Sequence, residues 1–320
     1  MGLHTALTSL LGIDHPIVSA PMGGVAGGLL AAAVSNGGGL GMVGSGDLDW
    51  LRRECAVAQA NTEKPWGVGL LAWAVDDDML RWVIDQRPAA IMLSFGDPTP
   101  YADAVRTAGI PLFVQVTTLS DANRALEVGA DAVVAQGAEA GGHGEGRGTL
   151  PFIPAVVDAA GATPVVAAGG IADGRGLAAA LMLGAAGAMI GTRFEATPEA
   201  LLSDGGRTAI TGASAAGTTR DRVLDIVVDS PWPHRFTART LRNRFTDAWH
   251  GHEDALRFDS SAKAEYRDGV ERGDPDYLPV WAGEAVDLIT DVHGATALVE
   301  RIAGEAAHAI DTVHANLGGS

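Results

Sequence analysis

A histidine placed in a run of glycines is the feature of this sequence that points most directly to chemistry. His143 lies in the segment AEAGGHGEGRGT (138–149), which leaves its imidazole few apolar neighbours to pack against. An unperturbed imidazole titrates near neutral pH, so it can accept or donate a proton or hydrogen-bond an anionic substrate. A glycine-rich segment can also wrap closely around a ligand. We therefore expect His143 to be a catalytic residue.

Two further turns, AAGGIADG (167–174) and IGTRF (190–194), have the composition of an anion site. Gly169 and Gly170 allow the backbone to approach an anion closely, because they carry no side chain. Gly191 and Thr192 offer further N–H groups and a hydroxyl. The two turns together predict a phosphate-binding site.

The elements that must position these residues are short apolar strands alternating with longer amphipathic stretches. Such alternation is typical of parallel strands that are buried on both faces and joined by helices. The expected strands are 16–21, 39–44, 66–71, 90–95, 111–116, 131–137, 164–170 and 186–192. The expected helices include 26–37, 49–61, 76–86, 120–129, 150–161 and 173–184, several of which begin with an Asp or Ser cap and end at Gly.

Eight strand–helix units in succession predict an α/β fold, a closed (β/α)8 barrel, with a doubly wound open sheet as the alternative. Ligands bind a barrel where its strands end and its helices begin, and a phosphate is commonly held after the last two strands. The two glycine turns occupy those positions. A phosphate that a barrel keeps permanently suggests flavin mononucleotide (FMN), and Ala20, Pro21 and Met22 after the first strand offer small, flat surfaces for a ring system.

The character of the chain changes after residue 196. Residues 197–280 are richer in charge and hold half of the arginines, which predicts a helical insertion or lid at the barrel mouth after the eighth strand. Residues 1–196 and 281–320 would then form the barrel, closed by a last helix at about 295–316.

Charge and composition exclude several classes of function. The net charge of −17, with no basic stretch, argues against nucleic acid and anionic membranes as partners. The start of the chain has no basic segment ahead of an apolar one, and no apolar run is long enough to span a bilayer, so we expect a cytoplasmic protein acting on a small molecule. Cys55, the single cysteine, is expected to be a buried apolar residue.

Two patterns are not interpreted as sites. GLGMVG (39–44) matches the dinucleotide motif in letters, but its glycines fall inside an expected strand that follows a helix, which is the wrong context. His250, His252 and Glu253 lack a further metal ligand at a known spacing, so we expect surface placement and no metal site.

Six motifs occur in order over nearly the whole chain: APMGG, FVQVTT, AQGAEAGGH, AAGGIADG, IGTRF and VWAGEAVDLI. With them the sequence resembles the nitronate monooxygenases, formerly called 2-nitropropane dioxygenases, which are FMN-dependent TIM barrels. The resemblance implies oxidation of alkyl nitronates, and of neutral nitroalkanes where these are substrates, by O2 to carbonyl compounds and nitrite.

The resemblance also implies roles for individual residues. His143 matches the histidine that removes the α-proton of a nitroalkane or hydrogen-bonds the nitronate oxygens. The turn Ala20–Met22 would face the isoalloxazine. The remaining flavin contacts would be Gln136 and Gly141, with Gly169, Gly170, Met189, Ile190, Gly191 and Thr192 around the ribityl phosphate.

The chain departs from the family pattern in two places. Gly69 stands where the family often has Asn, so one side-chain contact to the flavin is missing or replaced. Glu145 and Arg147 follow the histidine and could change what the mouth accepts, and Arg147 or His143 could supply positive charge for an anionic substrate.

Two alternative functions stay open from the sequence. The same barrel and glycine–histidine segment occur in NADH-dependent flavin reductases, namely enoyl-acyl carrier protein reductases and NADH:quinone reductases. A non-catalytic flavin- or phosphate-binding barrel is the other alternative. The sequence does not predict the oligomeric state.

Overall fold

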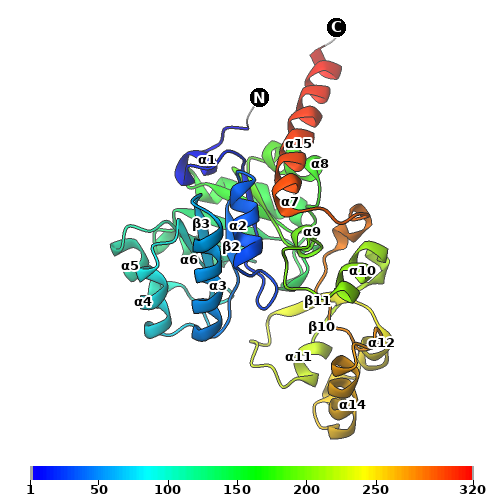
Figure 1. The fold of residues 1–320 in the computed structure, drawn as a ribbon. Helices are drawn as coiled ribbons and strands as arrows, with labels where there is room; N and C mark the ends of the chain where they lie inside the picture. The colour runs from blue at the N-terminus through cyan, green and yellow to red at the C-terminus, as the bar shows by residue number, and fades with distance from the viewer. Residues whose placement is uncertain (1–2, 319–320) are drawn as a thin grey trace.

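A computed structural model describes residues 3–318 of the chain. Eight parallel strands form its central sheet, and helices surround them (Figure 1). The strands are β1 (Ile17–Ser19), β2 (Gly41–Val43), β3 (Trp66–Leu71), β4 (Ala90–Ser94), β5 (Leu112–Val116), β6 (Ala132–Gln136), β8 (Val165–Ala168) and β9 (Gly187–Ile190). Each lies within one of the eight expected ranges. Pairing runs β1-β9-β8-β6-β5-β4-β3-β2, and a bridge between Val18 and Leu40 closes the circle. The predicted TIM barrel is therefore confirmed.

Helices follow the strands along the outside of the barrel. They are α2 (Gly28–Asn36), α3 (Leu48–Asn61), α4 (Asp77–Asp85), α5 (Thr99–Thr107), α6 (Leu119–Glu127), α7 (Thr149–Ala160), α8 (Gly174–Met182) and the short α9 (Thr192–Glu195). Several begin where the sequence provides a cap: Asp76 accepts from the amide of Met79, and Asp173 from that of Gly176.

Side chains alternate between the inside and the outside of the barrel, as the pleat of a strand requires. Along β9, Met189 packs inside with Met92 and Phe113, whereas Ile190 packs outside against the helices. Leu7, on helix α1 (Ala6–Leu11), joins the inner cluster and covers one end of the barrel. Cys55 is fully buried in the outer layer, as expected. This burial, and to a smaller extent the negative charge of Glu54, raises the pKa of its thiol to about 12.

The insertion lies beside one end of the barrel (Figure 1) and is only partly helical. Its elements are α10 (Asp204–Gly212), η1 (Ala215–Gly217), β10 (Thr218–Asp221), α11 (Val223–Val227), β11 (Thr237–Leu241), α12 (Arg244–Trp249), α13 (Glu253–Leu256) and α14 (Ser260–Glu271). Strands β10 and β11 form an antiparallel hairpin that the sequence patterns did not predict. A third antiparallel strand, β7 (Gly142–Gly144), comes from the barrel and pairs with β11.

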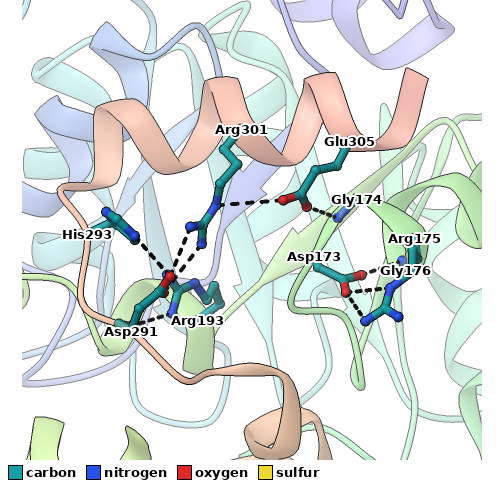
Figure 2. Close-up of polar contacts among 9 residues, drawn as sticks. All are labelled: Asp173, Gly174, Arg175, Gly176, Arg193, Asp291, His293, Arg301 and Glu305. Carbon is teal, nitrogen blue, oxygen red and sulfur yellow. Dashed lines mark hydrogen bonds and ion pairs between the residues drawn. The ribbon is translucent and has the colours of Figure 1, made fainter. Parts of the chain in front are cut away.

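After the insertion, η2 (Glu284–Leu288) returns the chain to the barrel, and α15 (Ala295–Gly318) packs against α2 and α8. Figure 2 shows the polar contacts below α15. Arg193, which is 2% exposed, donates to the backbone oxygen and the carboxylate of Asp291, at 2.8 and 2.5 Å. Arg301 and His293 reach the same carboxylate, and Glu305 accepts from the amide of Gly174. These contacts fix the last helix to the barrel.

We expect Asp291→Asn to destabilise the fold, because it leaves the buried Arg193 guanidinium without its carboxylate. Removing one partner of a fully buried ion pair lowers the free energy of unfolding by ~3–5 kcal/mol. The Asp291 side chain is 41% exposed, so solvent screens the pair and we expect a loss of about 2 kcal/mol. The hydrogen bond from Arg301 and the charge of Arg193 lower the pKa of Asp291 to about 2. Its contribution to stability is therefore present above about pH 4 and lost as the pH falls toward about 2.

Urea denaturation at several pH values measures this effect. The wild-type and Asp291→Asn curves should differ at neutral pH and converge in acid. Asp49→Asn is the matched control, because Asp49 pairs with Arg52 on an exposed helix face. A constant difference at all pH values would contradict the role of the Asp291 charge.

Among the described residues, no helix combines the length and the apolar character that crossing a bilayer demands.

Candidate active site

A cavity of about 370 Å³ opens where the barrel strands end. All but one of the residues expected at the flavin line it, together with His143: Ala20, Pro21, Met22, Gln136, Gly141, Gly169, Gly170, Met189, Gly191 and Thr192. The exception is Ile190, whose side chain points into the outer layer because it follows the inward-facing Met189 on β9. The lining also contains residues that the sequence patterns did not single out, among them Ser94, Phe95, Gln115, Glu139, Glu195, Trp232 and Trp281.

The turns after β8 and β9 present bare backbone to this cavity. Gly169 and Gly170 have φ angles of +102° and +73°, which L side chains rarely adopt. A Cβ on Gly169 would also lie 3.0 Å from the carbonyl oxygen of Gly137. The hydroxyl of Thr192 accepts from the amide of Gly283 at 3.0 Å, which fixes its position. Among the described lining residues there is no Lys or Arg, so an anion at this end of the cavity would meet neutral donors.

Position 69 has no room for a side chain. A Cβ on Gly69 would lie 2.4 Å from the Cβ and Cγ atoms of Pro21. The ring of Pro21 therefore occupies the space that a side chain on β3 would need. Both residues line the cavity, so the flat face of a proline takes the place of the side-chain contact that Gly69 cannot make.

His143 belongs to a strand rather than to the flexible loop that the glycines suggested. On β7 it pairs with Ala238 of β11, and the next residue pairs with Thr237. A glycine is needed where this strand begins, because Gly142, its first residue, has a φ angle of +71°, which L side chains rarely adopt. The imidazole is also well packed, contrary to expectation, since its side chain is only 9% exposed.

A buried carboxylate orients the imidazole. Nε2 of His143 lies 3.0 Å from both carboxylate oxygens of Asp225, on α11 of the insertion, whose side chain is 5% exposed. A carboxylate only accepts hydrogen bonds, so Nε2 carries the proton and Nδ1 of the neutral ring is left with the lone pair.

Trp232 covers the imidazole and extends across the mouth. Its ring stacks on that of His143 with centroids 3.5 Å apart and planes 8° apart. It also contacts Trp73 and Phe95, which follow β3 and β4, at centroid distances of 5.2 and 5.0 Å. One insertion side chain therefore connects strand β7 with two barrel loops and shields the histidine from water.

A row of amides holds the backbone next to His143. Gln115 on β5 donates to Gln136 on β6 at 2.9 Å, and Gln136 donates to the carbonyl oxygen of His143 at 3.0 Å. Both glutamines line the cavity. Gln136 thus positions the histidine strand in addition to facing the space where a ligand would lie.

Two arginines of the β10–β11 hairpin hold the segment that leads into β7. Arg220 donates to the carbonyl oxygens of Ala138 and Ala140, and Arg239 donates to that of Ala138. Burial, followed by the charge of Arg239, lowers the pKa of Arg220 to about 10. The hairpin is therefore part of the scaffold that fixes His143.

The two charged residues expected at the mouth lie elsewhere. The Arg147 guanidinium packs over the Phe152 ring at 4.9 Å, and Glu145 pairs with Arg235 and accepts from Thr117. Neither lines the cavity. Among the described lining residues, His143 is thus the side chain that can supply positive charge.

His250 and His252 of the remaining histidine pattern are exposed on the insertion. His250 is exposed and contacts Asp221 through Nδ1 at 2.9 Å. No group of three or more potential metal ligands occurs within residues 3–318.

Comparison with known proteins identifies the family of the chain. The family model described as "Nitronate monooxygenase" matches residues 4–83 and 72–305. The nitronate monooxygenase npaC of Metarhizium robertsii is 35% identical, over 94% of this chain and 93% of its own length. A Rhodococcus jostii relative, (3aS,4S,5R,7aS)-5-hydroxy-7a-methyl-1-oxo-octahydro-1H-indene-4-carboxyl-CoA dehydrogenase, is 36% identical over 75% of this chain and 67% of its own.

The solved structure of FabK from Thermotoga maritima superposes with a TM-score of 0.86 and 31% identity, covering 98% of this chain and 99% of that one. The family match covers nearly the whole barrel and the segments that carry His143 and the glycine turns. The chain therefore belongs to the nitronate monooxygenase family of oxidoreductases.

Proposed function

We propose that this protein is an FMN-dependent monooxygenase that oxidises alkyl nitronates with O2 to carbonyl compounds and nitrite. The observation that carries the proposal is the pairing of His143 with Asp225 at a cavity that bare glycine backbone also lines. A proton acceptor and an anion cradle in one cavity suit a small acidic substrate next to a phosphorylated cofactor.

The residues present fit FMN. Gly169, Gly170, Gly191 and Thr192 would hold its phosphate through amides and a hydroxyl, and Pro21 with Gly69 would form a flat surface for its ring. When bound, FMN would take electrons from the nitronate and pass them to O2.

His143 has two uses in this reaction. With Nε2–H donated to Asp225, Nδ1 would remove the α-proton of a neutral nitroalkane, and Asp225 would stabilise the resulting imidazolium. That imidazolium would then hydrogen-bond the nitronate oxygens. It would thus supply the positive charge that the other described lining residues lack.

The shape of the mouth supports a small, mainly apolar substrate. Phe95, Trp232 and Trp281 line the cavity beside the histidine. Their rings would exclude water from the reacting atoms, which strengthens the electrostatic effect of the His143–Asp225 pair.

The experiment that tests the proposal is anaerobic reduction of the purified protein, followed by flavin absorbance. We expect propyl nitronate to bleach the flavin rapidly and NADH to leave it unchanged. Rapid bleaching by NADH alone would instead place the protein among the NADH-dependent flavin reductases. Bleaching by neither compound would favour a non-catalytic barrel, and a protein that binds no FMN would contradict the proposal altogether.

A further inference from the structure

One buried acid of the cavity lining has no role in the proposed reaction. Glu195, the last residue of α9, is 2% exposed and lines the cavity. Its Oε1 atom has no hydrogen-bond partner within the described part of the chain. Leaving a buried polar atom unpaired is costly, and Glu195 lines the cavity, so its carboxyl group indicates a missing ligand.

The position of Glu195 indicates which part of a ligand it would meet. It lies three residues after Thr192, so both side chains lie on one face of α9. Helical side chains lean toward the N-terminus of their helix, which here is Gly191. Glu195 therefore belongs to the end of the cavity formed by the glycine turns.

No charged neighbour compensates an ionised Glu195 within the described residues. Arg193 on the same helix pairs with Asp291, and residues 20–27 of the loop after β1 carry no charge. On the facing η2, Glu284 pairs with Arg239, and Asp287 accepts from the amide of Ala215.

The other titratable groups of the cavity are engaged as well. Glu139 accepts from the amide and hydroxyl of Thr149, and His143 pairs with Asp225. Burial alone raises the pKa of Glu195 to about 8, so at neutral pH its carboxyl is protonated and can donate a hydrogen bond.

We propose that Glu195, as a neutral carboxylic acid, donates a hydrogen bond to the terminal phosphate of FMN. The inference rests on the proposed FMN cofactor and adds a binding residue to it. A protonated acid is a donor for a phosphate oxygen, whereas a carboxylate would repel the phosphate charge. FMN binding should therefore weaken as rising pH ionises Glu195.

Titration of the apoprotein with FMN and with riboflavin, followed by flavin fluorescence, tests the inference. Between about pH 7 and about pH 9.5 the phosphate is already a dianion, so its own titration does not interfere. We expect the Kd for FMN to rise about 10- to 30-fold over this range. The Kd for riboflavin, which lacks the phosphate, should stay constant.

Two variants separate the hydrogen bond from a structural effect. Glu195→Gln keeps a donor that does not ionise, so its Kd for FMN should change less than about twofold with pH. Glu195→Met removes the donor and should weaken FMN about 10-fold at pH ~7 without affecting riboflavin. An infrared carbonyl band of a protonated acid should be present in the wild type, shift with FMN and be absent from Glu195→Gln.

A flat pH profile for wild-type FMN binding, or the same pH dependence in Glu195→Gln or with riboflavin, would overturn the role of Glu195 while leaving the cofactor intact. Failure to bind FMN at about pH 7 would overturn the proposed function itself.

Discussion

Replacing His143 with alanine should lower kcat/KM for a neutral nitroalkane by ~10²–10⁴-fold while FMN stays bound, because a positioned general base contributes about that factor. The flavin should be retained because the glycine turns after β8 and β9 lie on other elements than β7. Steady-state kinetics together with the flavin absorbance of the purified variant measure both effects.

Asp225→Asn is the informative companion variant. An amide can still hydrogen-bond Nε2, but it carries no charge to stabilise the imidazolium and no longer fixes the tautomer. We expect an intermediate loss with nitroalkanes and a smaller loss with preformed nitronates, from which no proton is removed. Full activity of His143→Ala with every candidate substrate would remove His143 from the mechanism.

Gly170→Val should abolish tight FMN binding, raising its Kd about 100-fold. The φ angle of +73° is strained for any L residue and most strongly for a β-branched one. A Cβ at this position would also lie 3.3 Å from that of Glu139, and the valine would cover the backbone that the phosphate should approach. The flavin-to-protein absorbance ratio after purification gives the first reading, and titration of the apoprotein gives the Kd.

Gly146→Val is the control for this change. Gly146 is exposed and does not line the cavity, and a Cβ added to it would meet no atom within 4 Å. We expect this variant to retain FMN as the wild type does. Full flavin occupancy in Gly170→Val would refute the phosphate site after β8.

The sequence predicted the barrel well because its strands are buried on both faces. Segments such as 90–95 and 111–116 are mainly apolar runs, each with a single polar residue (Ser94 or Gln115) near its end. Such runs are typical of strands that are buried on both faces. The glycine turns were predictable for a related reason: consecutive strands bring consecutive turns to one end of a barrel. Among the residues expected at the flavin, only Ile190 does not line the cavity, because the side chains alternate between inside and outside along β9.

The surroundings of His143 were not predictable from local patterns. Asp225 lies 82 residues away, and VLDIV reads as an ordinary amphipathic segment. Trp232 lies between two prolines in a stretch without periodicity, and β7 is three residues with two glycines, which no strand propensity would favour. These features depend on long-range pairing, since β11 supplies the partner strand for β7.

The β7–β11 pairing joins two parts of the chain at the cavity. The barrel contributes the glycine turns and His143, whereas the insertion contributes Trp232 to the lining and Asp225 as the partner of His143. Because the residues proposed to hold the cofactor all lie outside residues 197–280, we expect substitutions there to alter the substrate pocket while leaving the cofactor site in place. The insertion is therefore the part of the chain to vary when a different substrate range is to be engineered, with the β10–β11 hairpin kept to hold the histidine strand.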